Sequence, residues 1–267
     1  MVVVVHTFPM AGLRVEAVAS IPEELRRAYL AALAEPQELY VEQLVAIGQA
    51  YVVFCGPELQ GYVVVAGETI VELHVDDAGL ETLPALFAAT LAESGATRAL
   101  CKTFDTTMVT AAASRPATTR TVGFLFRSVR DRSSISDARL RPRLGTAADA
   151  DSVWSMHDGF FEDRDEIDRY AADDRLFVYG TTADELVGCG ILTRVIAAQR
   201  AVDVGMVVAK AHRQRGFGAY LVAHLKHHCL QRGDRPICGC SADNQSSRRA
   251  LENAGFVTAH SLIEFTY

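Results

Sequence analysis

The sequence lacks several features that would assign it to a specialised class of protein. It has no run of 18 apolar residues, so we expect no membrane span. Its apolar start, MVVVVHTF, has neither a basic segment nor a long hydrophobic stretch, which argues against a signal peptide. Basic residues are not in excess, because 26 Lys and Arg stand against 33 Asp and Glu, giving a net charge of −7. Such an acidic chain is a poor candidate for binding nucleic acid.

Cysteine lacks the spacing that metal sites require. The six cysteines lie mostly inside apolar runs, and none forms a C-x-x-C pair. We interpret them as reduced core residues of a cytoplasmic protein. Cys238 and Cys240 would share one face of a short strand, but no other Cys or His pair is spaced to complete a zinc site. We therefore expect no metal.

The composition is that of a globular chain long enough for two domains. Of the 267 residues, 49% are hydrophobic and 22% are charged. Residues 1–137 carry 10 basic and 16 acidic side chains, whereas residues 138–267 carry 16 and 17. Negative charge would attract a cationic substrate such as an amine, and it would equally keep the protein in solution.

Residues 203–220, DVGMVVAKAHRQRGFGAY, have the pattern of a strand, a basic glycine loop and a helix. The β-branched run Val202–Val208 predicts a buried strand, and the loop Arg213–Gly218 leads into a helical pattern. A helix start leaves backbone amides unpaired, and these can bind phosphate. Gly216 and Gly218 would allow a ligand close approach. A tight turn with solvated arginines is the alternative interpretation.

The loop resembles the signature Q/R-x-x-G-x-G/A of the GNAT superfamily of acyl-CoA-dependent N-acyltransferases. Arg213, Gly216 and Gly218 fill its three defined positions. Downstream, NQSSRRALENAGF from Asn244 to Phe256 resembles the family's second signature, an Asn followed by a helix that ends in Gly-Phe. The resemblance implies acyl transfer from acetyl-CoA, the co-substrate, to a primary amine of a small molecule.

Both halves carry the same order of expected elements, β, α, α, β, β, β, α, β, α, β, which resembles the GNAT topology twice. We therefore expect an α/β fold with two tandem GNAT-like domains, each a mixed β-sheet flanked by helices. The first would span residues 1–130 and the second residues 138–267, joined by a polar linker at 131–137. The expected elements are 13–17, 22–33, 38–47, 50–55, 60–66, 69–75, 80–94, 99–103, 106–114 and 122–129, then 139–144, 147–161, 164–172, 176–182, 186–195, 202–208, 218–232, 236–241, 245–254 and 257–265.

The halves differ at the turn that would hold CoA. After the strand 69–75, the first half has Asp76, Asp77 and Glu81, a single glycine and no arginine. Three carboxylates would repel a diphosphate. We expect this half to keep the fold without binding CoA, and to serve in packing, in completing the acceptor pocket or in an interface.

The resemblance implies a V-shaped gap beside the strand 202–208, opened by a bulge in that strand. The strand's backbone would pair with the pantetheine amides, the loop amides would hold the diphosphate, and the Val208 N–H would stabilise the thioester oxyanion. Asn244 would contact the far arm of CoA or the acetyl region. The expected cofactor-binding residues are Met206, Val207, Val208, Arg213, Gln214, Arg215, Gly216, Phe217, Gly218, Ala219 and Asn244.

The catalytic residues stay open. The family's tyrosine, which protonates the leaving thiolate, would align with Leu251, so the proton could come from Ser247, from Tyr267 or from water. The usual glutamate positions on the strand are valines here. Asp203, between them, is the candidate base, although strand alternation puts it on the opposite face unless a bulge intervenes. A surface position is the alternative.

The acidic segment 158–174 falls on helices that line the acceptor pocket in the family. Glu162, Asp163 or Glu166 would bind the amine, or these residues would form a solvated helix face. His157 would be a base or a core residue. A CoA-binding sensor without turnover and a protein N-acetyltransferase are alternative functions. We expect no nucleic-acid or membrane partner, and a monomer or homodimer.

Overall fold

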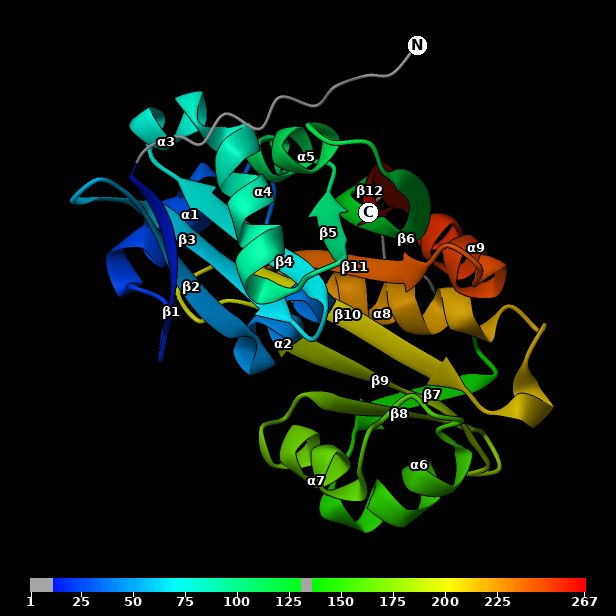
Figure 1. The fold of residues 1–267 in the computed structure, drawn as a ribbon. Helices are drawn as coiled ribbons and strands as arrows, with labels where there is room; N and C mark the ends of the chain where they lie inside the picture. Colours follow the sequence, from blue (N-terminus) through cyan, green and yellow to red (C-terminus); the bar gives the residue numbers. More distant parts are fainter. Residues whose placement is uncertain (1–11, 131–135) are drawn as a thin grey trace. The chain divides into compact units, whose positions relative to one another are not determined.

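The structure is a computed structural model, and it describes residues 12–130 and 136–267 (Figure 1). Most of the expected linker, residues 131–135, and the first eleven residues lie outside the described part. The secondary structure confirms the expected α/β class and the expected order of elements in both halves. Within the described residues, no helix combines the length and the apolar character needed to cross a membrane.

The first half contains six strands and five helices in the described chain. They are β1 (Leu13–Val18), α1 (Glu23–Ala32), α2 (Leu39–Ile47), β2 (Gln49–Cys55), β3 (Glu58–Ala66), β4 (Thr69–Val75), α3 (Asp77–Glu81), α4 (Leu83–Ser94), β5 (Arg98–Lys102), α5 (Thr106–Ala113) and β6 (Thr118–Val129). The expected helix 80–94 is preceded by the short α3, because Asp76 caps a separate turn there by accepting a hydrogen bond from the Gly79 amide at 2.8 Å.

The second half repeats this order with two added 3₁₀ turns. It comprises β7 (Leu140–Leu144), η1 (Ala147–Asp149), α6 (Ala150–Met156), α7 (Arg164–Ala172), β8 (Leu176–Thr181), β9 (Leu186–Arg194), β10 (Ala201–Val208), η2 (Lys210–His212), α8 (Phe217–Gln231), β11 (Arg235–Ser241), α9 (Gln245–Asn253) and β12 (Phe256–Thr266). The expected helix 147–161 is too long. It ends at Met156, because Asp158 and Gly159 have φ angles of 52° and 79°, which no helix accommodates.

The chain forms two compact units whose limits differ from the expected limits at 130 and 138. The first unit is Met1–Val122 with Leu262–Tyr267, and the second is Gly123–Ser261. The difference arises because β6 and β12 each begin in one unit and end in the other. The end of β12 pairs with β5 inside the first unit, from Leu262 opposite Lys102 to Thr266 opposite Arg98. The end of β6 pairs with β11 inside the second unit.

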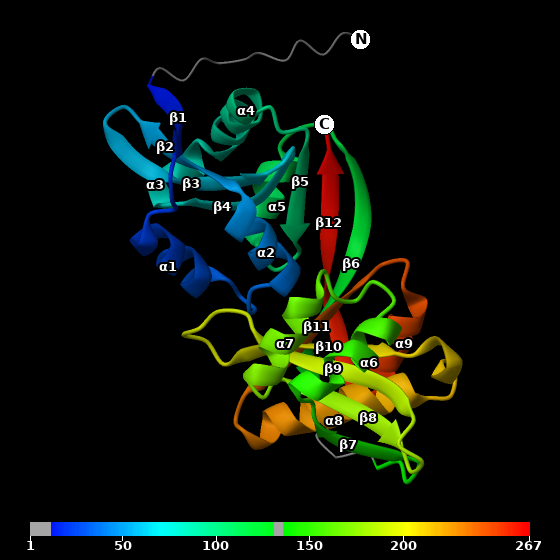
Figure 2. The ribbon, with the colours of Figure 1, turned by 90° about the horizontal axis from the view of Figure 1, so that it is seen from below.

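In the first unit the strand order is β1-β2-β3-β4-β5-β12. Helices α1 and α2 cover one face of this sheet, and α4 and α5 cover the other (Figure 2). The α4–α5 face holds an apolar core that includes Leu73, Phe87 and Met108. The opposite face carries buried polar side chains, described further below.

In the second unit the strand order is β6-β11-β10-β9-β8-β7. Helices α6 and α7 pack on one face and α8 with α9 on the other, each over its own apolar core (Figure 1). Two glycines of β9 allow α8 to lie close to the sheet. A Cβ on Gly188 would lie 3.0 Å from Leu221 Cδ2, and one on Gly190 would lie 2.4 Å from Leu225 Cδ1. Helix α8 thereby packs on β9 as well as on β10.

Strand β10 separates from β11 soon after it begins. The two pair in parallel from Ala201 to Asp203, whereas β10 stays paired with β9 as far as Val208. The expected gap is therefore present, but the expected bulge in β10 is wrong, since the β9–β10 register is continuous. Register shifts occur instead between other pairs of strands: β2 with β3 at Val53/Phe54, β3 with β4 at Val64/Val65, and β8 with β9 at Tyr179/Gly180.

Candidate active site

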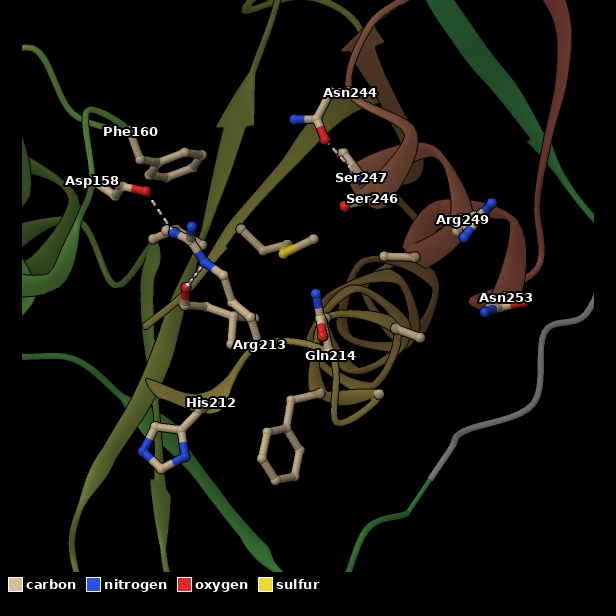
Figure 3. Close-up of a pocket in the computed structure, with 18 of the residues that line it drawn as sticks. Asp158, Phe160, His212, Arg213, Gln214, Asn244, Ser246, Ser247, Arg249 and Asn253 are labelled. Atoms are coloured by element: carbon tan, nitrogen blue, oxygen red, sulfur yellow. Dashed lines mark hydrogen bonds and ion pairs between the residues drawn. The ribbon is translucent and has the colours of Figure 1, made fainter. Parts of the chain in front are cut away.

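A cavity of about 790 Å³ lies in the second unit where β10 has left β11. Its walls are the end of β10, the loop into α8, the first turns of α8 and α9, and the loop after α6 (Figure 3). Of the eleven residues expected to bind the cofactor, ten line this cavity, and Arg215 is the exception. The cavity thus brings together the strand and glycine loop, residues 206–219, with the second signature, which begins at Asn244.

The start of α8 presents unpaired backbone amides to the cavity. Gly216 is the N-cap, with a φ of 82°, and no side chain caps the helix. Within the described chain, the amides of residues 214–219 donate to no protein acceptor. A Cβ on Gly218 would lie 3.3 Å from Met206 Cε and 3.4 Å from Ala250 Cβ, so β10 and α9 approach the helix closely here. These amides and the helix dipole form a binding site for an anion such as a diphosphate.

The free edge of β10 presents further backbone groups to the same cavity. The Ala209 amide donates to the Val187 carbonyl at 2.9 Å. With the β9–β10 register, this bond shows which residues of β10 direct their backbone groups at β9. Alternation then directs the N–H and C=O of Met206 and Val208 away from β9, toward the side that β11 has left. The backbone of Val207 points at β9, so only two of the three expected strand residues can pair with a ligand through the main chain.

The guanidinium of Arg213 is already bound to protein groups and is not free to face a diphosphate at the loop amides. Its Nε donates to the Val208 carbonyl at 2.9 Å, and its Nη2 donates to Asp158 at 2.8 Å (Figure 3). Lys210 also contacts Asp158, at 2.7 Å, and the hydrogen bonds from Lys210 and Arg213 lower the pKa of this carboxyl group. Arg213 therefore holds the glycine loop to the end of β10 and to the loop after α6, a role that sequence alone did not indicate.

Helix α9 forms the opposite wall. Asn244 caps the helix by accepting a hydrogen bond from the Ser247 amide at 2.9 Å, and both residues line the cavity. Ser246, Arg249 and Asn253 also line the cavity, although no sequence motif indicated them. Their spacing of three and four along a predicted helix could have indicated that they share one face.

Leu251, which takes the place of the family's tyrosine, is 3% exposed and belongs to the core under α8. The residue one helical turn earlier, Ser247, is the nearest hydroxyl on this helix to line the cavity.

Asp203 lies at the point where β10 and β11 begin to separate, outside the lining of the 790 Å³ cavity. It alternates with Val202 and Val204, which face α8, so its side chain is on the α6–α7 face. Thr193 lies opposite it on β9, and the Tyr170 hydroxyl of α7 is 2.7 Å from the Thr193 hydroxyl. Burial raises the pKa of Tyr170, and the nearby charge of Asp203 adds to this shift.

The three acidic residues expected to bind an amine lie around the start of α7, where the side chains of Asp163 and Glu166 hold the backbone. Asp163 accepts a hydrogen bond from the Glu166 amide at 2.7 Å, and Glu166 accepts one from the Glu162 amide at 3.0 Å. None of the three lines the large cavity. Glu166 instead lines a smaller cavity of about 380 Å³, together with Tyr170 and Arg175.

Two other candidates have clear positions. Tyr267 falls in the first unit, where its hydroxyl donates to the Ala112 carbonyl at 2.9 Å, and burial raises its pKa. His157 lines the large cavity, stacks on Trp154 with ring centroids 4.1 Å apart, and accepts a hydrogen bond from the Phe161 amide at 3.2 Å. Within residues 12–130 and 136–267, no group of three His, Cys, Asp or Glu side chains is placed to hold a metal ion.

Known families match both halves of the sequence. The acetyltransferase (GNAT) family matches residues 147–256, and an acetyltransferase (GNAT) domain matches residues 20–129. Comparison with curated proteins gives no matching relative.

Solved structures share the fold over nearly the whole chain. An acetyltransferase of the GNAT family from Colwellia psychrerythraea has a TM-score of 0.83 at 14% identity, covering 95% of this chain and 99% of that one. A GCN5-related N-acetyltransferase from Sphaerobacter thermophilus has a TM-score of 0.67 at 14% identity, covering 96% of each chain. A tandem GNAT protein from the clavulanic acid biosynthesis pathway has a TM-score of 0.62 at 16% identity, covering 96% of this chain and 98% of that one. With a GNAT match in each half and the glycine-loop cavity in the second, the chain belongs to the GNAT family of acetyltransferases, in its tandem form.

Proposed function

We propose that the protein is an N-acyltransferase that moves an acetyl or other short acyl group from CoA to a primary amine of a small molecule. Transfer would occur by direct attack in a ternary complex. The unpaired amides of residues 214–219, beside the free edge of β10, carry this proposal. They suit a diphosphate followed by an extended chain of amides, which is the chemistry of the CoA arm. The sequence halves 1–130 and 138–267 would be a supporting and a catalytic GNAT domain.

The co-substrate would lie along three groups of atoms. The amides around Gly216 would bind the diphosphate, and the outward backbone groups of Met206 would pair with a pantetheine amide. The Val208 N–H, directed at the gap, would stabilise the negative charge that develops on the thioester oxygen. Arg249 and Asn253 of α9 add polar groups to the wall opposite the strand.

We assign the general base to Asp203. The residue sits at the apex of the gap, on the face covered by α6 and α7, where an acceptor amine could approach the thioester from the side opposite α8. Five residues of extended strand, roughly 16 Å, separate Asp203 from the Val208 N–H. The carboxylate would therefore take the proton of the attacking amine through intervening water. Thr193 and Tyr170 supply hydroxyl groups beside it. Ser247 or water would then protonate the thiolate, since Leu251 has no proton to give.

A CoA-binding sensor without turnover is the competing function, and the leucine at the tyrosine position favours it. The test is release of free thiol from acetyl-CoA, measured with a panel of primary amines that includes amino acids, amino sugars and polyamines. Turnover well above the rate without acceptor supports the enzyme. Tight CoA binding without turnover of any amine would support the sensor, and the absence of CoA binding would contradict both.

The first unit is expected not to bind CoA. The Gly79 amide already donates a hydrogen bond to the Asp76 side chain, so it is not available to a phosphate. Asp77 and Glu81 place two further negative charges at the same turn. Replacing Asp77 with alanine should therefore leave the CoA dissociation constant, measured by calorimetry, within about twofold of the wild type. A larger change would place the co-substrate in the first unit and contradict the assigned site.

A further inference from the structure

The first unit buries a connected set of charged and polar side chains on the face of its sheet covered by α1 and α2. Lys102 of β5 is 1% exposed, Glu72 of β4 is fully buried, and Asp105, the N-cap of α5, is 4% exposed. Tyr29 of α1 and Gln37, between α1 and α2, are 2% and 1% exposed. Buried charges are costly unless they are paired, so this arrangement needs a physical reason.

The Lys102 ammonium group is held by several acceptors at once. Its Nζ donates to the Tyr29 hydroxyl at 2.5 Å and to Gln37 Oε1 at 2.7 Å, and it lies 3.8 Å from Asp105 Oδ2. The Tyr29 hydroxyl in turn donates to Asp105 at 2.8 Å. An ammonium group has three N–H donors and no acceptor, so a phenol oxygen, an amide oxygen and a carboxylate form a complementary set.

The acceptors of this ammonium are in turn held by further contacts. Gln37 is oriented because its Nε2 donates to Glu72 at 2.9 Å, and Glu72 also accepts a hydrogen bond from the Tyr62 hydroxyl at 2.7 Å. Arg26 Nε lies 2.8 Å from the same carboxyl group. Each acceptor of the lysine is therefore held in place by a second interaction, as in a preorganised binding site.

The position of this network corresponds to the proposed acceptor face of the second unit. Helices α1 and α2 hold the same place in the order of elements as α6 and α7, and β4 the same place as β10. Strand β4 also separates from β5 early, after Thr69 and Ile70 have paired with it. Glu72 lies on the face of its sheet that α1 and α2 cover, where Arg26 of α1 contacts it, and Asp203 lies on the face that α6 and α7 cover.

We propose that the first unit contains a primary-ammonium binding site that is permanently filled by the side chain of Lys102. The half has then lost not only a CoA loop but also an open acceptor site, because its own lysine occupies the space of an alkylamine. One chain would accordingly bind one acceptor. The proposal itself can be tested without acyl transfer, so its failure is distinguishable from failure of the proposed function.

The test is chemical rescue of Lys102→Ala in the full chain. This substitution removes three methylene groups and the ammonium, which together have the shape of n-propylammonium. The thermal midpoint should fall clearly below that of the wild type and should rise by several degrees, saturably, when n-propylammonium is added at constant ionic strength. The neutral analogue 1-propanol should give no comparable rise, and neither additive should stabilise the wild type.

Three further variants sharpen the test. Lys102→Met fills the space without a charge, so it should be destabilised and should not respond to the amine. Lys102→Gly leaves room for one more carbon and should be rescued better by n-butylammonium than by n-propylammonium. Adding Gln37→Leu to Lys102→Ala should abolish the rescue.

The proposal would be overturned if amine and alcohol raised the thermal midpoint of Lys102→Ala equally. It would also be overturned if n-propylammonium and n-butylammonium acted equally on Lys102→Ala and Lys102→Gly. If Lys102→Ala does not fold in buffer, refolding yield with each additive becomes the readout. Recovery only with the amine supports the proposal, and no recovery with any additive overturns it.

Discussion

Replacing Gly216 with glutamate is expected to weaken acetyl-CoA binding by about 100-fold or more while the second unit stays folded. A Cβ at this position meets no heavy atom within 4 Å, so the new side chain has room beside the cavity. The φ of 82° adds backbone strain of about 1–2 kcal/mol, which a stable unit tolerates. A carboxylate about 5 Å from one phosphate charge costs about 3 kcal/mol at an effective dielectric constant near 20, or about 100-fold in affinity.

The matched control for this change is Gly216→Gln. It shares the backbone strain and nearly the size of glutamate, so the two variants should have similar thermal midpoints. Calorimetry should show a much larger loss of CoA affinity for the glutamate variant, and the difference should shrink as salt is raised. Equal CoA affinity of Gly216→Glu and wild type would show that the diphosphate does not bind at the start of α8.

Replacing Asp203 with asparagine is expected to lower kcat/KM for acyl transfer by about 10²–10⁴, the usual contribution of a general base. The change preserves size and removes the proton acceptor. CoA affinity should be unaffected, because Asp203 does not line the CoA cavity. The measurement is steady-state thiol release with the best acceptor, alongside the CoA dissociation constant.

Asp163→Asn serves as the control for this experiment. Asparagine can still cap α7 by accepting the hydrogen bond from Glu166, so activity and stability should stay close to wild type. If Asp163→Asn lost activity and Asp203→Asn kept it, the assignment of Asp203 as the base would be wrong. The acidic residues at the start of α7 would then be the ones that bind the acceptor amine.

The sequence predicts the elements well where the signals are local. The β-branched run of β10, the glycine loop and the glycines that follow α4, α8 and α9 all act over a few residues, and the strand 69–75 coincides with β4. The same local signals predict the cavity wall, because a helix start supplies free amides whatever its distant partners are.

The sequence does not predict a residue's contacts where they depend on partners far along the chain. Arg213 binds Asp158, 55 residues away, so its pairing could not be predicted from the loop. Lys102 meets Tyr29 and Gln37 at separations of 73 and 65 residues. Tyr267 was a candidate acid, but its strand ends in the first unit through a register with β5 that no local pattern specifies.

The course of β6 and β12 has a consequence for how such a gene can change. A recombination breakpoint within residues 131–137 would give two fragments, and each would lose the strand that covers β5 or β11. Uncovered strand edges promote aggregation, so neither fragment would be a usable module. The two halves can diverge in their side chains, as the acidic and the glycine-rich turns have done, but they must be inherited as one piece.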